Sequence, residues 1–123
     1  MQDRQVTQLL ESVFKETSFA VSDTITTGDG QIHPIEMKYE SKSIKSIVKY
    51  NYVEKSITLE IFNKLKAHVV TNSSVDDDVV DSYIVYPSLY EAKLNVDLFN
   101  SSEVEEKLKE IIHFTVVLLG RVS

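Results

Sequence analysis

Three histidines and one acidic run are the side chains best suited to chemistry in this chain of 123 residues. His33, His68 and His113 lie far apart, and none has a second ligand three or four residues away, the spacing that places two metal ligands on one helix face. We therefore expect structural or solvated histidines, no metal site and no cofactor. The chain has no cysteine, which excludes disulfides, thiol catalysis and thiolate metal sites.

The acidic run contains the densest group of carboxylates in the chain: Asp76, Asp77, Asp78 and Asp81. A calcium loop needs oxygens at alternating positions around a turn glycine, and this run has neither. We interpret it as a solvated loop, with a cation or a basic partner as the alternative. No nucleophile elbow and no phosphate-binding loop motif is present. The sequence thus predicts no catalytic residue and no enzymatic activity.

Charge is distributed unevenly along the chain. The net charge is −6, yet residues 38–68 hold seven lysines against three glutamates. This basic segment is either a binding face or one half of an internal charge complementarity across neighbouring strands. The lysines that define the candidate basic face are Lys38, Lys49, Lys64 and Lys66. Strand alternation places the tyrosines of this segment on the face opposite the lysines. A nucleic-acid platform needs tyrosines and lysines on the same face.

Apolar spacing predicts a helix at each end of the chain. Residues 3–15 carry one apolar stripe, and Asp3 is the expected N-cap. Ser102 and Glu105 form the pattern of a capping box that starts the second helix, and Gly120 is its expected end. Residues 111–119 are apolar almost all round, which predicts burial on two sides, in the core or in a subunit interface. A strand over 113–119 is the alternative.

Alternation of apolar and polar residues predicts the strands. We expect strands over residues 18–25, 35–40, 47–52, 57–70, 79–86 and 90–98. The glycines at 28 and 30 are typical of a hairpin turn. Near Asn63 we expect a bend or bulge, or a break that makes residues 63–70 a separate element. Residues 72–78 are expected to form an exposed loop.

These elements predict one α+β domain spanning residues 1–123. We expect an antiparallel meander of about five to seven strands, flanked by an N-terminal and a C-terminal helix packed on one face. No apolar run approaches the roughly 18 residues that span a membrane, and the polar start shows no secretory signal. The expectation is a soluble cytoplasmic protein, and the composition suggests a bacterial or phage origin.

The function that remains is that of a small non-enzymatic protein-binding domain: an inhibitor, immunity-type factor, chaperone or assembly adaptor that occludes or holds another protein. An acidic protein suits a basic partner. The expected contact residues are the acidic residues Asp76, Asp77, Asp78, Asp81, Glu103, Glu106 and Glu110. A homodimer is expected through the apolar residues Phe114, Val117 and Leu118. Binding of nucleic acid or an anionic ligand on the basic face is the alternative, and a small-molecule pocket between sheet and helices stays open.

Overall fold

The computed structural model describes residues 2–15, 17–73 and 80–122, without the side chains of 72, 73, 80, 81, 115, 116 and 118–122. Its helices and strands are α1 (Asp3–Phe14), β1 (Ala20–Thr26), β2 (Ile32–Glu40), β3 (Ile44–Asn51), β4 (Ser56–Asn63), β5 (His68–Ser73), β6 (Val80–Val85), β7 (Ser88–Asn95) and α2 (Ser101–Val122). Two short 3₁₀ helices, η1 (Lys64–Lys66) and η2 (Val96–Leu98), follow β4 and β7.

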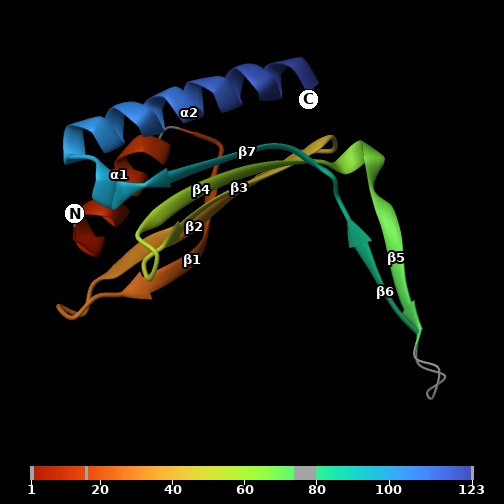
Figure 1. Ribbon diagram of the computed structural model, residues 1–123, viewed down its shortest axis with the longest axis horizontal. Coiled ribbons are helices and arrows are strands. Elements are labelled where there is room, and N and C mark those ends of the chain that lie inside the picture. The colour runs from red at the N-terminus through yellow and green to blue at the C-terminus, as the bar shows by residue number, and fades with distance from the viewer. Residues whose placement is uncertain (1, 16, 74–79, 123) are drawn as a thin grey trace.

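The strands form one sheet of five and one ribbon of two. The sheet has the order β1-β2-β3-β4-β7, and every pairing in it is antiparallel. β5 and β6 pair only with each other and form a ribbon that continues from the paired strands β4 and β7. Both helices lie on one face of the sheet (Figure 1). The predicted α+β architecture, with terminal helices on one face and five to seven strands, is confirmed.

The core lies between the helices and this face. Val6, Leu10 and Phe14 of α1 are buried, which confirms the apolar stripe predicted for residues 3–15. Val104 and Leu108 of α2 join the same cluster. The sheet contributes the alternate residues of its strands that point toward the helices: Ile35, Met37, Val48, Tyr50, Ile57, Leu59 and Leu94. The opposite face of the sheet, called here the open face, carries no helix.

Both helix starts differ from the prediction. α1 begins after Gln2, whose N–H donates to Gln5 Oε1 at 3.0 Å, so Asp3 is the first helical residue and not the cap. At α2 the capping residue is Asn100, two residues before the predicted Ser102: its Oδ1 accepts the Glu103 N–H at 2.9 Å, and the helix starts at Ser101. An asparagine side chain competes equally well for this position.

The end of α2 also corrects the prediction. The helix continues through Gly120 to Val122, so that glycine does not terminate it. Residues 113–119 are helical, which removes the alternative of a strand.

Two asparagines end strands of the main sheet. Asn63 Oδ1 accepts the Leu65 N–H and Asn95 Oδ1 accepts the Asp97 N–H, each at 3.0 Å, and a 3₁₀ turn follows both. The predicted strand over residues 57–70 is wrong, because β4 ends at Asn63 and β5 starts at His68 in the other sheet; the alternative of a break near Asn63 is confirmed. The apolar face does not continue through Leu65, which is 73% exposed. The predicted strand 90–98 ends at Asn95 for the same reason.

Both edge strands are irregular. β1 shifts register against β2 between Val21 and Asp23 and again between Asp23 and Thr24. β7 shifts against β4 where Ile61 pairs with Tyr90 and Phe62 pairs with Ser88, which leaves Leu89 as an extra residue. Such bulges interrupt the regular ladder of an edge strand.

A polar contact joins the start of α1 to the turn between β3 and β4. Asp3 Oδ1 accepts hydrogen bonds from the Tyr50 hydroxyl at 2.6 Å and from Lys55 Nζ at 2.5 Å. Partial burial alone would raise the pKa of Asp3, but the bonds from Lys55 and Tyr50 and the positive charge of Lys55 hold it below its ordinary value. Burial and the neighbouring Asp3 carboxylate raise the pKa of Tyr50, which therefore stays a neutral donor.

We expect Asp3→Asn to lower the free energy of unfolding by about 1 kcal/mol at neutral pH, because the charge-assisted bond to Lys55 is lost. A lowered folded-state pKa stabilises the protein above the ordinary aspartate range, and this stabilisation disappears as the pH falls through the lowered value. Urea denaturation at neutral pH and near pH ~3 would measure both effects. Glu103→Gln, an exposed change of the same kind, is the control. A difference between wild type and variant that does not shrink in acid would contradict the assignment.

Candidate interaction surfaces

Ion pairs neutralise most of the charge on the open face. Glu36 lies between two lysines: its Oε1 is 3.4 Å from Lys38 Nζ and its Oε2 is 4.0 Å from Lys49 Nζ. Lys64 Nζ in η1 is 2.7 Å from Glu40 Oε1. The register explains the first group, because Glu36 of β2 is directly opposite Lys49 of β3. Lys49 thus faces a carboxylate across the strands, whereas Lys38 has its partner on the same strand and Lys64 reaches from η1 to β2.

Three of the four lysines of the predicted basic face are paired with carboxylates. Lys38, Lys49 and Lys64 each have an acidic partner, and Lys66 has no ion pair among the described residues. Tyr50 is buried on the opposite side of the sheet, as the alternation predicted. The contacts favour internal charge complementarity, because a lysine already paired with a carboxylate contributes less to phosphate attraction.

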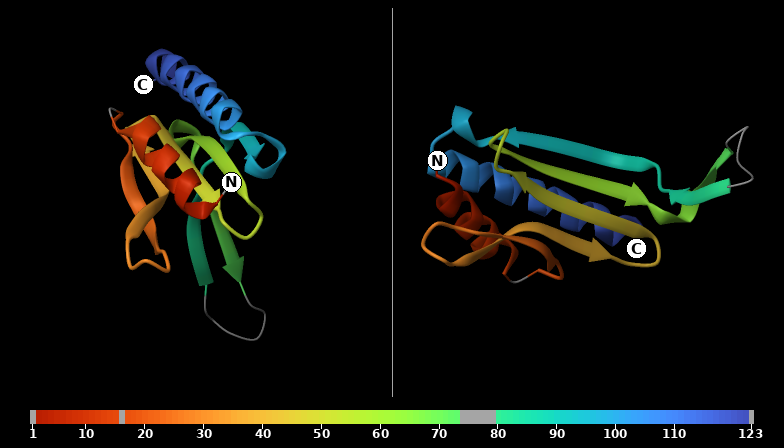
Figure 2. Two further views of the ribbon diagram at one scale, coloured as in Figure 1. Left: turned by 90° about the vertical axis from the view of Figure 1, so that its left-hand side faces the viewer. Right: turned by 90° about the horizontal axis from the view of Figure 1, so that it is seen from below.

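The ribbon of β5 and β6, called here the arm, stands away from the core. It leaves the sheet on the side opposite the helices, and the turned views agree (Figures 1 and 2). Beyond marginal contacts, the described residues of β5 and β6 pack on no element but each other. Val69 and Ile84 are directly opposite each other and are 64% and 61% exposed. Tyr83, on the other side of the arm, is 51% exposed.

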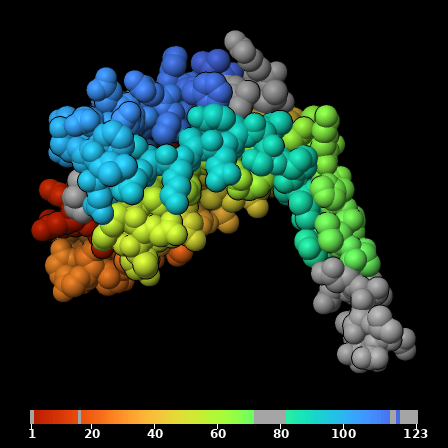
Figure 3. Space-filling view, viewed as in Figure 1, coloured from red at the N-terminus to blue at the C-terminus, as the bar shows by residue number. Residues whose placement is uncertain are grey.

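The arm and the open face together border a hollow. In the space-filling view the body and the arm form an arch, with the hollow on the side away from the helices (Figure 3). Sequence reasoning missed the arm, because its alternation looks the same as that of a strand within the main sheet. The signal that was present is Asn63, which ends β4 and starts the turn into the arm.

The predicted acidic contact residues divide into two groups. Asp76, Asp77 and Asp78 lie outside the described residues, and of Asp81 only the backbone is described, opposite Asn72 in the arm. Glu103, Glu106 and Glu110 are exposed on α2. Their spacing of three and four residues places them on one side of the helix. The structure thus brings the second group together and leaves its relation to the first undescribed.

The predicted dimer residues lie in the second half of α2. Phe114 is 46% exposed, and its ring packs against Tyr90 of β7 with the centroids 4.6 Å apart. Val117 is 42% exposed. The side chain of Leu118 lies outside the described part. Among the described residues, α2 is therefore well buried in its first half only, through Val104 and Leu108.

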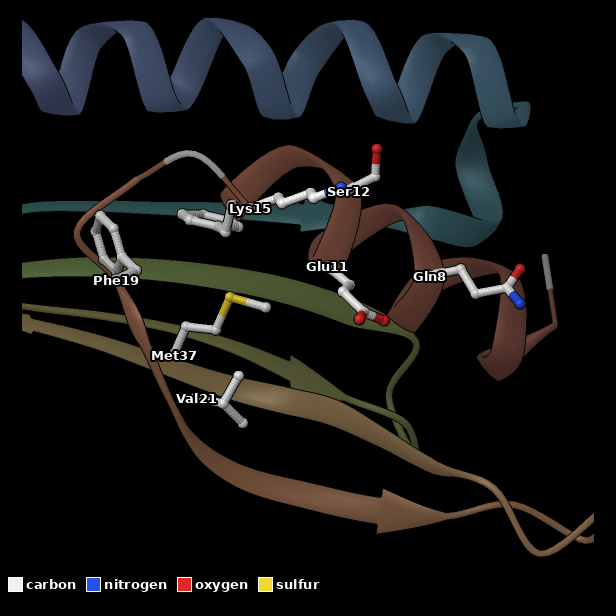
Figure 4. Close-up of a pocket in the computed structure, with 8 residues that line it drawn as sticks. Gln8, Glu11, Ser12, Lys15, Phe19, Val21 and Met37 are labelled. Carbon is white, nitrogen blue, oxygen red and sulfur yellow. The ribbon is translucent and has the colours of Figure 1, made fainter.

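A groove of about 530 Å³ separates α1 from the edge strand β1 (Figure 4). Its apolar lining comes from Phe14, Phe19, Val21 and Met37, and its polar lining from the α1 residues Gln8, Glu11, Ser12 and Lys15. All four polar residues are exposed, and none of the eight lining residues is a buried polar group. The groove therefore has no convergent polar groups of the kind that orient a small substrate.

No group of three or more histidine, aspartate or glutamate side chains in the described part of the chain could hold a metal ion. No helix in the same part has both the length and the apolar character needed to cross a membrane.

Comparison of the chain with protein-family models, with curated proteins and with solved structures finds no match.

Proposed function

We propose that this chain is a small non-enzymatic protein-binding domain that holds or occludes a partner protein with its arm and open face. The arm is the observation that carries the proposal. An isolated two-stranded ribbon is marginally stable in water, and this one exposes Val69 and Ile84 together. Packing of both side chains against a partner would bury apolar area and order the ribbon at once. The net charge of −6 favours a partner with a basic surface.

The arm is expected to be required for partner binding. In Val69→Thr/Ile84→Thr both residues stay β-branched, so the strands are retained while the apolar contact is lost. A tagged wild-type chain should capture a stoichiometric protein partner from lysate of its native host, and this variant should lose it. Val21→Thr is the control, because Val21 is a β-branched residue on β1 that is 55% exposed, close to the values of Val69 and Ile84.

Nuclease treatment in parallel separates the proposal from its alternative. A partner that survives nuclease and depends on the arm supports protein binding. Loss of all co-purifying material on nuclease treatment would instead favour nucleic-acid binding through the basic face. Equal capture by wild type and the arm variant would contradict the role given to the arm.

The exposed end of α2 supports self-association as a second, weaker contact. Two copies that cover Phe114 and Val117 would bury the apolar surface that the chain leaves open. We expect sedimentation to show a concentration-dependent dimer, and Val117→Ser to shift it toward monomer. A strict monomer at high concentration would remove the dimer.

A further inference from the structure

Two carboxylates lie directly opposite each other on the open face. The register of β4 and β7 pairs Glu60 with Glu91. Like charges at opposed positions of a sheet repel and destabilise it. Neither glutamate has an ion pair in the described part of the chain, although Glu36, Glu40 and Glu54 all have lysine partners. The paired glutamates are thus an uncompensated negative site within a face that is otherwise largely neutralised.

Apolar side chains lie beside this site. Phe62 follows Glu60 by two residues on β4, and Leu89 precedes Glu91 by two residues on β7. Alternation and register place Glu60, Phe62 and Glu91 on the open face, and Leu89, the extra residue of the bulge in β7, follows the residue that is opposite Phe62. Phe62 is half-buried and Leu89 is 46% exposed. Lys45 is opposite Phe62 and makes no ion pair within the described chain.

We infer that the open face binds an extended protein segment with a lysine or arginine at Glu60 and Glu91 and an apolar residue at Phe62. This inference rests on the proposed function and names the chemistry of the partner. Charge complementarity selects the occupant: a guanidinium can donate hydrogen bonds to both carboxylates and relieves the repulsion between them. Residues two apart in an extended chain are about 7 Å apart on one side. The cation and the apolar residue of the partner should therefore be separated by one residue, as Glu60 and Phe62 are.

The test uses a synthetic peptide with Leu-Ser-Arg at its centre and serine or threonine on both sides. Titration into the full ¹⁵N-labelled protein should shift the amide signals of β4 and β7. A peptide with Leu-Ser-Glu should not shift them. In Glu60→Gln/Glu91→Gln the affinity for the arginine peptide should fall roughly tenfold, as for one lost charge-assisted hydrogen bond. Glu11→Gln/Asp29→Asn removes the same charge from α1 and from the turn between β1 and β2, and should leave the affinity unchanged.

The stability of the glutamine variant and the comparison of the two peptides separate the possible outcomes. The glutamine variant loses a repulsive pair, so it should unfold at the same temperature as the wild type or higher, and misfolding cannot explain its weaker binding. Equal affinity for the two peptides, or an affinity unchanged in Glu60→Gln/Glu91→Gln, overturns the inference. If Glu60→Gln/Glu91→Gln still captures the partner that the arm variant loses, this inference fails and the proposed function stands. If the wild type captures no partner, the proposed function fails.

Discussion

Truncation of Leu108 to alanine is expected to lower the free energy of unfolding by about 2–5 kcal/mol. Leu108 of α2 is 1% exposed and lies in the cluster that also holds Leu10 of α1 and Leu59 of β4. Its removal leaves a cavity where both helices meet the sheet, and close-packed neighbours refill such a cavity only in part. Urea denaturation with constant m-value would measure the loss.

Leu98→Ala is the matched control for this prediction. Leu98 in η2 is 73% exposed, so the same truncation should change stability by no more than about 0.5 kcal/mol. Equal effects of the two substitutions would mean that α2 is not docked on the sheet as described.

The second large effect concerns local stability. Backbone amides of β5 and β6 are expected to exchange with solvent about a thousandfold faster than those of β3, or more. β3 is hydrogen-bonded on both sides, to β2 and to β4, and Val48 and Tyr50 anchor it in the core. The arm has one hydrogen-bonded edge per strand and little packing on the body. Its strands can therefore separate without unfolding the core.

Native-state hydrogen exchange followed by NMR would test this difference residue by residue. Similar protection in Val70 of the arm and Val48 of β3 would show that the arm opens only with the whole domain. The proposed function requires the opposite, since an arm that is ordered by its partner must be the less stable part when alone.

Local pattern accounts for much of the fold. The stripe of Val6, Leu10 and Phe14 and the alternation along β4 depend on neighbours within a few residues, and both predicted their elements correctly. The errors at Asn95 and Asn100 are also local: each asparagine side chain accepts a backbone N–H and ends one element or begins another. Asn63 ends β4 in the same way, and there the sequence does predict a break.

Register is what the sequence could not supply. Whether Glu36 meets Lys49, and whether Glu60 meets Glu91, depends on pairings between strands that alternation leaves free to slide by two residues. Alternation also does not determine which strands pair, so it could not predict that β5 and β6 pair only with each other and separate from the main sheet. For this reason the predicted acidic and basic contact residues were chosen by charge, and the glutamate pair on the open face was not among them.

The irregular edges have a consequence for behaviour at high concentration. A regular edge strand is a template on which another copy can add strand by strand, the route to filaments. β1 shifts its register twice around an exposed Asp23, and β7 has its extra residue at Leu89 and alternates Glu91 with Lys93. A strand from a second copy could not pair along either edge without interrupting the regular series of backbone hydrogen bonds. The body of the protein is thereby protected from edge-to-edge polymerisation, even while the arm displays apolar side chains.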